Sequence, residues 1–277
     1  MSLRDKRLGF IGGGQMAEAI IKGVLASGLT TADRISVSEP LSARRDYLRE
    51  TFPELKLLAD NRKLVQESEV VVLAVKPQVM PKVLEEIAPE VGEHHLLISI
   101  AAGITLGFLE KLLPEKARII RVMPNTPALV LAGISAYTGG RNVSSSDLAL
   151  AREFLSALGE AVELPEALFD AVTGLSGSGP AFVALFIEAL IDGGVKVGLP
   201  RPVAEKLALE TVLGTAKLMK ETKKNPYALK AMVTSPGGTT ICGVKALMDK
   251  GLHAAVMEAV EQATRRSEEL SKNLEAD

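Results

Sequence analysis

The chain has 277 residues, 47% hydrophobic and 24% charged, a balance that is typical of a globular protein and excludes a disordered or fibrous one. Its 32 basic and 34 acidic residues leave a net charge of −2, which argues against nucleic acid or an acidic membrane surface as the main partner. The single cysteine, Cys242, excludes an internal disulfide, and with only three histidines beside it we expect no metal site.

We expect neither a targeting segment nor a membrane span. The start, Met1–Arg7, is charged, and the longest apolar runs, Val70–Val75 and Ala181–Ile187, are far shorter than the about 18–20 residues that cross a bilayer. The sequence therefore predicts a cytoplasmic protein that binds neither nucleic acid nor membrane.

The first part of the chain alternates short β-branched runs with amphipathic segments of helical length, such as Ala17–Ala26 and Pro77–Ile87. This alternation predicts an α/β fold with a doubly wound, mostly parallel sheet covered on both faces. A further helix is expected at Asp147–Leu158, and His94 and His95 are expected in a solvated turn. The predicted strands are Arg7–Ile11, Arg34–Ser38, Leu55–Ala59, Glu69–Val75, Leu96–Ile100, Arg118–Met123, Ile134–Thr138 and Ala161–Leu164.

After Pro165 the pattern becomes helical, so we predict an α/β domain over residues 1–164 and an all-helical domain over 165–277. The helix at Ala181–Ile191 is apolar on nearly every face, and such a helix must be covered on all sides. Since so short a domain has little core of its own, we expect a homodimer or a larger homo-oligomer. The predicted helices lie at about 180–195, 202–221, 238–249 and 252–274.

A glycine-rich motif follows the first predicted strand. Ile11 leads into Gly12-Gly13-Gly14-Gln15-Met16-Ala17, the pattern G-x-G-x-x-A between a strand and a helix. The first glycine allows a tight turn, Gly14 lets a pyrophosphate approach the backbone, and Ala17 lets helix and strand pack closely. The helix start adds free N–H groups for the phosphates. The motif therefore predicts a Rossmann domain that binds a dinucleotide through Ile11, Gly12, Gly14, Gln15 and Met16.

The end of the second predicted strand, at Ser38 and Glu39, is expected to meet the ribose of that dinucleotide. An acid at this place accepts hydrogen bonds from the ribose hydroxyls and favours NAD. Arg44 and Arg45 follow, and they are interpreted either as ligands of a 2′-phosphate or as a solvated helix face. The sequence leaves the choice between NAD and NADP open.

Later strand ends are expected to line the same crevice. Small residues there suit a flat cofactor, although they also suit an ordinary loop. The candidate residues are Ala74, Val75, Lys76, Pro77, Ala101, Ala102 and Gly103.

A second glycine-rich loop, Ser235-Pro236-Gly237-Gly238-Thr239-Thr240, precedes a helical pattern. Consecutive backbone N–H groups at a helix start bind anions, so the loop is a candidate carboxylate site. A plain helix N-cap made by a Ser or Thr hydroxyl is the alternative. Arg121 is a second candidate for the carboxylate, although an arginine in a strand is more often structural.

With these motifs in place, the chain resembles the pyrroline-5-carboxylate reductase family over nearly its whole length. A generic Rossmann enzyme would share the first of the motifs given below and not the last three. The resemblance is carried by Gly9–Met16, Ala74–Pro77, Ala101–Gly103, Met123–Pro127, Asp170–Ala181, Asp192–Pro200 and Ser235–Thr240.

The resemblance implies reduction of the cyclic imine Δ1-pyrroline-5-carboxylate to L-proline with NADH or NADPH, by a Rossmann domain followed by a helical dimerisation domain. Ser235, Gly238 and Thr239 would hold the substrate carboxylate, and the Thr240 hydroxyl would lie at the ring nitrogen as the catalytic group. Asn61 and Asn125 would contact the adenosine and the nicotinamide. Glu39 departs from the small or basic residues of members that favour NADPH.

Two other functions are weighed beside this one. A hydroxyacid dehydrogenase of the same two-domain plan would use Lys196 as its acid and base, because a carbonyl needs a proton donor. A non-catalytic sensor would bind the dinucleotide but would not oxidise it with any imine. Imine reduction needs less acid catalysis, since a cyclic imine is basic enough to arrive protonated.

Overall fold

The computed structural model describes residues 3–276, with side chains up to residue 272. The described chain divides into two compact units, one of residues 3–177 with 262–276 and one of residues 178–261. We call them the nucleotide unit and the helical unit. The boundary expected at residue 164 stays a prediction.

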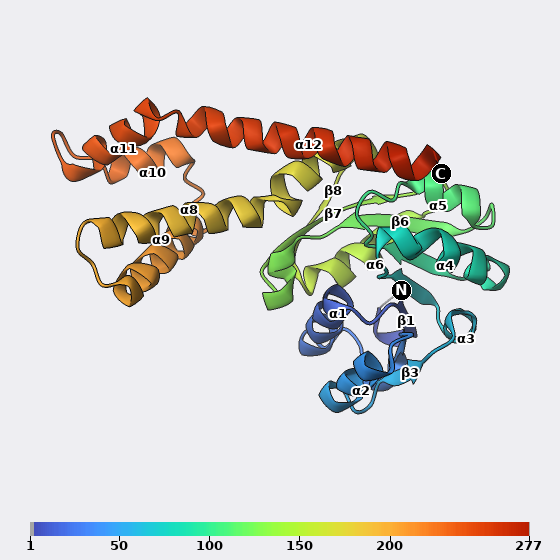
Figure 1. Cartoon of the computed structure of the whole chain (residues 1–277). Helices are drawn as coiled ribbons and strands as arrows, with labels where there is room; N and C mark the ends of the chain where they lie inside the picture. The colour runs from blue at the N-terminus through green and yellow to red at the C-terminus, as the bar shows by residue number, and fades with distance from the viewer. Residues whose placement is uncertain (1–2, 277) are drawn as a thin grey trace. The chain divides into compact units, whose positions relative to one another are not determined.

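The nucleotide unit is built on one sheet that contains every strand of the described residues (Figure 1). The strand order is β3-β2-β1-β4-β5-β6-β7-β8, and all neighbours are parallel except the antiparallel pair β6 and β7. This confirms the doubly wound, mostly parallel sheet, whose order reverses between β1 and β4. The strands are β1 (Leu8–Ile11), β2 (Ile35–Ser38), β3 (Lys56–Leu58), β4 (Val70–Leu73), β5 (Leu96–Ser99), β6 (Arg118–Met123), β7 (Gly133–Gly139) and β8 (Gly159–Glu163).

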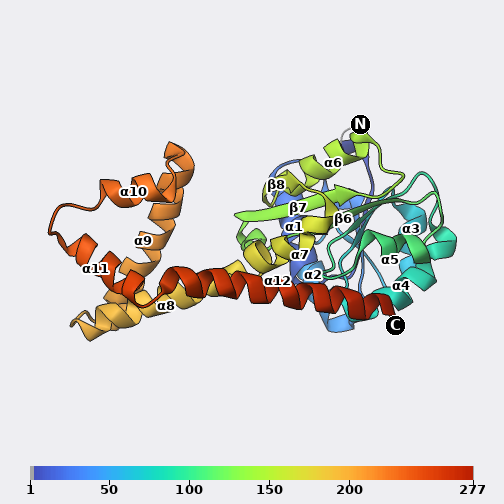
Figure 2. The same cartoon turned by 90° about the horizontal axis from the view of Figure 1, so that it is seen from above.

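Helices lie on both faces of this sheet (Figure 1, Figure 2). Their apolar side chains are buried against it in two clusters. One cluster joins α1, α2 and α6 to side chains such as Phe10 and Val72, and the other joins α3, α4 and α5 to Val71 and Leu97. Because both faces are covered, β4 is apolar and buried at every position, as parallel strands require. The helices are α1 (Gln15–Ala26), α2 (Ser42–Thr51), α3 (Asn61–Glu67), α4 (Met80–Ile87), α5 (Leu106–Leu112), α6 (Ser145–Ser156) and α7 (Phe169–Val172).

The expectation that His94 and His95 share a solvated turn is wrong for His95, which is only 1% exposed. Its Nδ1 accepts a hydrogen bond from the Gly92 N–H at 2.8 Å, and its Nε2 lies 3.1 Å from the Val65 carbonyl oxygen. These contacts fit the neutral ring with its proton on Nε2. Burial lowers the pKa of His95, and the neighbouring His94 and Arg118 lower it further.

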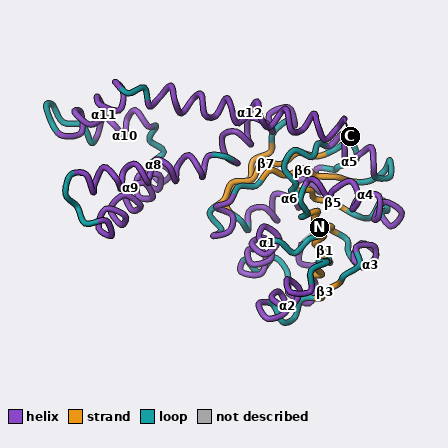
Figure 3. The backbone as a smooth tube through the Cα atoms, in the orientation of Figure 1, coloured by secondary structure: helices purple, strands orange, loops and turns teal. Residues whose placement is uncertain are grey.

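The helical unit contains helices and loops only, as Figure 3 shows. Its described side chains include just three that are buried, Ala204, Ala208 and Leu229. An apolar groove is lined by Phe182, Phe186 and eight further apolar residues of α8, α9 and α12. The helices are α8 (Gly179–Lys196), α9 (Arg201–Thr222), α10 (Pro226–Met232), α11 (Thr239–Asp249) and the first part of α12 (Leu252–Ala276).

Candidate functional site

The loop between β1 and α1 lies where the strand order of the sheet reverses. Gly12 has φ +96°, and a Cβ on it would come within 2.7 Å of the Ala74 carbonyl oxygen, so only glycine fits this turn. Its N–H donates to the Ser38 carbonyl at 2.8 Å, and the Ala74 N–H donates to the Ile11 carbonyl at 2.9 Å. The carboxyl ends of β1, β2 and β4 therefore meet at the glycine loop, the place where doubly wound folds bind their ligands.

The start of α1 is open to an anion. Gly14 is its exposed N-cap, no side chain caps it, and a Cβ at this position would meet no other part of the described chain within 4 Å. Ala17, by contrast, is buried against the sheet. The first N–H groups of a helix lack intrahelical partners and carry partial positive charge, so these residues fit the pyrophosphate of a dinucleotide.

Glu39 lies beside this loop, directly after β2, and is buried. Its Oε2 accepts a hydrogen bond from the Gly13 N–H at 2.9 Å, and its Oε1 accepts one from the Leu41 N–H at 3.0 Å. The carboxylate thus joins the end of β2 to the glycine loop and is held in one position.

Both arginines of α2 bind backbone carbonyl groups, so their interpretation as a solvated helix face is wrong. Arg44 donates from Nε to the Gly13 carbonyl and from Nη2 to Glu18, each at 2.6 Å. Arg45 donates from Nη1 to the carbonyls of Glu39 and Pro40, each at 2.7 Å. Glu18 also accepts from Lys22 and Tyr47; burial acts to raise its pKa, but these donors outweigh it and leave the pKa lowered.

The remaining predicted cofactor residues lie at the ends of the strands or in the segments that follow them. Ser38 and Ala101 are buried, Ala74, Val75 and Pro77 are half-buried, Lys76 and Ala102 are exposed, and Gly103 has φ +77°. Asn61 begins α3 and donates to Glu86 at 2.9 Å, while the Asn125 side chain accepts from the Ile134 N–H at 3.0 Å.

Arg121, the second candidate for the carboxylate, has a structural role instead. It is buried, pairs with Glu166 at 2.7 Å, and lies over the Phe169 ring at 4.8 Å. Glu166 also accepts from the Leu106 N–H at 2.7 Å. The guanidinium therefore ties β6 to the segment that follows the sheet.

The second glycine-rich loop turns into α11. Gly237 has φ +66°, the Gly238 N–H donates to the Ser235 carbonyl at 3.2 Å, and a Cβ on Gly238 would collide with the Ser235 hydroxyl. The N-cap of α11 is Gly238 itself, without a side-chain hydrogen bond, so the alternative of a hydroxyl cap is wrong. Thr239, exposed, and Thr240, partly exposed, form the first turn of the helix.

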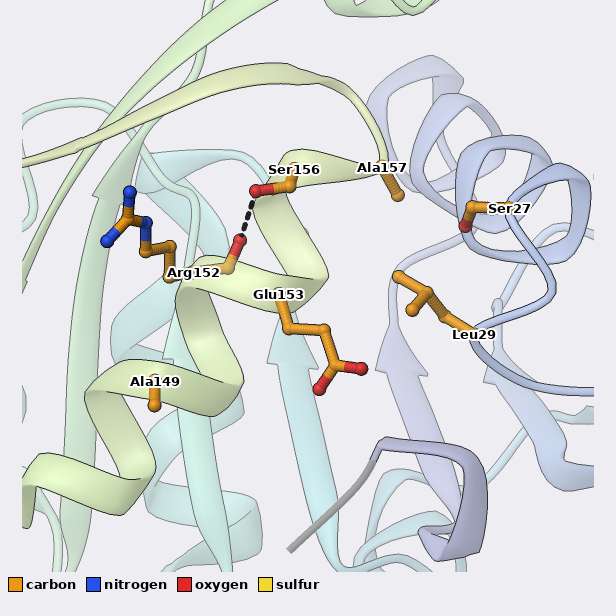
Figure 4. Close-up of a pocket in the computed structure, with 7 residues that line it drawn as sticks. All are labelled: Ser27, Leu29, Ala149, Arg152, Glu153, Ser156 and Ala157. Carbon is orange, nitrogen blue, oxygen red and sulfur yellow. Dashed lines mark hydrogen bonds between the residues drawn. The ribbon is translucent and has the colours of Figure 1, made fainter.

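A hollow in the nucleotide unit lies away from the glycine loop (Figure 4). It is lined by residues of α6 and by Ser27 and Leu29, at the opposite end of α1 from Gly14. Its Ser156 hydroxyl is already bound to the Arg152 carbonyl. Among the described residues, no group of three or more His, Cys, Asp or Glu side chains is placed to hold a metal ion.

Two family models match this chain. The model described as "Pyrroline-5-carboxylate reductase dimerisation" matches residues 166–270, and the model described as "NADP oxidoreductase coenzyme F420-dependent" matches residues 7–103. The first therefore covers the helical unit and the second covers the glycine loop with the first five strands.

Curated relatives match along almost their full length. The pyrroline-5-carboxylate reductase of Synechocystis sp. is 53% identical over 96% of this chain and 98% of its own. That of Methanosarcina acetivorans is 44% identical over 98% of this chain and 100% of its own.

Solved structures of similar proteins also match over nearly the whole chain. The pyrroline carboxylate reductase of Plasmodium falciparum, with NADP bound, has a TM-score of 0.86 and 34% identity, over 97% of this chain and 99% of that one. The pyrroline-5-carboxylate reductase of Coxiella burnetii has a TM-score of 0.90 and 36% identity, over 96% and 98%.

Proposed function

The chain belongs to the pyrroline-5-carboxylate reductase family, and we propose that the start of α11 holds the substrate of this reaction. As a member, it is an NAD(P)H-dependent oxidoreductase that reduces the C=N bond of Δ1-pyrroline-5-carboxylate to give L-proline. This function takes the place of the hydroxyacid dehydrogenase that would use Lys196 and of the non-catalytic sensor.

The observation that carries the proposal is the uncapped start of α11. Because Gly238 has no side chain to satisfy the first N–H groups of this helix, those groups are available to a carboxylate. The Ser235 and Thr239 hydroxyls add two neutral donors beside them. Ser235, Gly238 and Thr239 thus form the proposed carboxylate site.

Thr240 is the proposed catalytic residue, with its hydroxyl at the ring nitrogen of the imine. Once the imine nitrogen is protonated, the neighbouring carbon is electrophilic, so the protein has to orient the ring and to hold or relay one proton. A hydroxyl can do both, which explains how the site works without a histidine. The bound nicotinamide supplies the hydride.

We propose that the nicotinamide cofactor lies along the carboxyl ends of the parallel strands. The start of α1 would hold the pyrophosphate, Glu39 and Asn61 the adenosine side, and Asn125 the nicotinamide side. The proposed cofactor residues are Ile11, Gly12, Gly14, Gln15, Met16, Ser38, Glu39, Asn61, Ala74, Val75, Lys76, Pro77, Ala101, Ala102, Gly103 and Asn125.

The helical unit supports a homo-oligomer, and we propose a homodimer that covers α8. Val183, Leu185, Phe186 and Leu190 of this helix are exposed in the single chain. The short apolar runs of the sequence led us to expect no membrane span. The helical stretch Glu166–Lys196 nevertheless has a length and composition that could cross a membrane. The dimerisation model matches the same stretch, and a helix buried between protein chains needs the same apolar surface. We therefore keep a cytoplasmic location as part of the proposal.

Gly238→Pro tests the carboxylate site. Proline removes the Gly238 N–H that donates to the Ser235 carbonyl and fixes the turn before α11, so binding of L-proline should be lost while NAD⁺ binding survives. Titration calorimetry with each ligand separates the two affinities. Ser235→Ala, which keeps the backbone, should weaken the binding of L-proline by about tenfold and leave the binding of NAD⁺ unchanged. An equal loss of both affinities in the two variants would contradict the assignment.

A further inference from the structure

We propose that Glu39 selects NADH over NADPH, and that Arg44 and Arg45 position the glycine loop instead of binding a 2′-phosphate. This inference rests on the proposed dinucleotide site and names its preferred cofactor. Sequence alone leaves the choice open, because an acid and two arginines follow β2 within a few residues. The side-chain contacts decide between them.

The Glu39 carboxylate is a prearranged acceptor. It is 8% exposed, and each of its oxygens holds one backbone N–H, that of Gly13 or that of Leu41. An ionised carboxylate offers about four acceptor sites, so two remain for further donors. Two adjacent ribose hydroxyls are such donors, and a buried, immobile acceptor binds them at little entropic cost.

A 2′-phosphate meets the opposite conditions at this place. It is an anion with acceptor oxygens only, and it would lie against a carboxylate that the Gly13 and Leu41 N–H groups hold in position. Like charges brought together away from water are strongly unfavourable, and neither group can donate to the other. Glu39 therefore penalises NADPH as well as favouring NADH.

Two of the five N–H donors of each arginine already hold groups at or beside the glycine loop. Arg44 bridges the Gly13 carbonyl and the buried Glu18, and its guanidinium lies over the Tyr47 ring at 4.7 Å. Arg45 holds the carbonyls of Glu39 and Pro40. These contacts hold both guanidinium groups in place beside the loop. Arg44 thus acts on the dinucleotide through Gly13, as a positioning residue.

The first experiment measures dissociation constants of NAD⁺ and NADP⁺ by titration calorimetry on the full-length protein, with no imine present. NAD⁺ should bind at least about tenfold more tightly than NADP⁺, the scale of one hydrogen bond to a charged group. NADP⁺ binding as tight as NAD⁺ would overturn the proposal. Since no reduction occurs, this result stands whether or not the reaction assignment holds.

Glu39→Gln tests the carboxylate directly. The amide keeps the size and one acceptor but loses the charge, so the preference for NAD⁺ over NADP⁺ should shrink by about 10- to 100-fold. Glu50→Gln removes the same charge from an exposed position on α2 and should leave both constants unchanged. Thermal unfolding of both variants checks that the fold is intact. An unchanged ratio in folded Glu39→Gln contradicts the role of Glu39.

Arg44→Ala separates positioning from phosphate binding. If Arg44 is a positioning residue, its removal should weaken the binding of NAD⁺ and of NADP⁺ by the same factor, about tenfold. It should also raise the KM for NADH, while kcat at saturation stays the same. A ligand of the 2′-phosphate would weaken NADP⁺ alone, and that outcome would overturn the proposal. Arg49→Ala, on the same helix but paired only with exposed Asp46, is the matched control and should change neither constant.

Discussion

The two units of this chain bury their apolar side chains very differently. In the nucleotide unit, two clusters fill both faces of a sheet and include large side chains with no exposed surface, such as Phe10 and Phe154. In the helical unit, the described side chains that are buried are Ala204, Ala208 and Leu229, while large apolar side chains of every helix are exposed. Burial of apolar area is the main free energy of folding, so the first unit has its own core and the second lacks one.

This difference assigns distinct tasks to the two units. A self-sufficient unit can present a rigid loop to a cofactor within a single chain. A helical unit without a core becomes stable when a second copy covers it, so its proposed substrate loop should depend on assembly. Each prediction below tests one side of this comparison.

Leu185→Asp should have the largest effect. Leu185 is 66% exposed in the single chain. In a symmetric dimer, Leu185→Asp would bury one unpaired charge from each of the two chains. We expect a monomer by light scattering and a loss of activity of roughly 100-fold or more at micromolar protein. Val130→Asp, at a 75% exposed position of the nucleotide unit, is the control and should keep the wild-type mass. If the mass of the Leu185→Asp oligomer equals that of the wild type, no second copy of the chain covers this face.

Arg121→Ala should weaken the nucleotide unit from within. It removes the pair with Glu166 and the contact with Phe169, and the free energy of unfolding in urea should fall by about 2–4 kcal/mol. Arg49→Ala breaks an ion pair whose two side chains are exposed, and it should cost about 0–0.5 kcal/mol. Equal costs for the two variants would show that Arg121 is not a structural tie. The oligomer should persist in both.

Thr240→Ala should lower kcat/KM by about 10- to 100-fold, the scale of one positioned catalytic hydrogen bond. Absorbance at 340 nm follows the oxidation of NADH with pyrroline carboxylate as substrate. Thr240→Ser keeps the hydroxyl and should retain most of the activity. Unchanged turnover in Thr240→Ala would remove this residue from the mechanism, while the fold and the cofactor site would stand.

The smallest effect should be a pH dependence of stability that originates at His95. Because burial lowers the pKa of His95 in the folded chain, the unfolded chain holds more protons below the ordinary histidine pKa of 6.5. The free energy of unfolding should therefore fall as the pH drops from 6.5 toward the folded pKa. Urea unfolding at several pH values should show a flatter dependence in His95→Gln, whereas His94→Gln, at an exposed position, should keep most of it.

Much of the fold was predictable because its signals are local. The apolar runs of β1 and β4 and the glycines that follow them depend on neighbours along the chain, and every predicted strand is present. The polar helix α2 was considered only as one interpretation of Arg44 and Arg45, since only Leu48 of its ten residues is buried and its pattern is weak. His95 was placed wrongly because its partner, the Val65 carbonyl, lies 30 residues away.

The sequence by itself determined the element types, the two glycine-rich turns and the family resemblance, because backbone conformation and binary patterning act over a few residues. Only the tertiary structure decided what the charged groups do. Arg44 reaches Gly13 across 31 residues, Arg121 reaches Glu166 across 45, and Glu39 meets the glycine loop across 26. A buried charge takes whichever partner the packed chain brings within hydrogen-bond distance, and that choice is made after the elements have assembled.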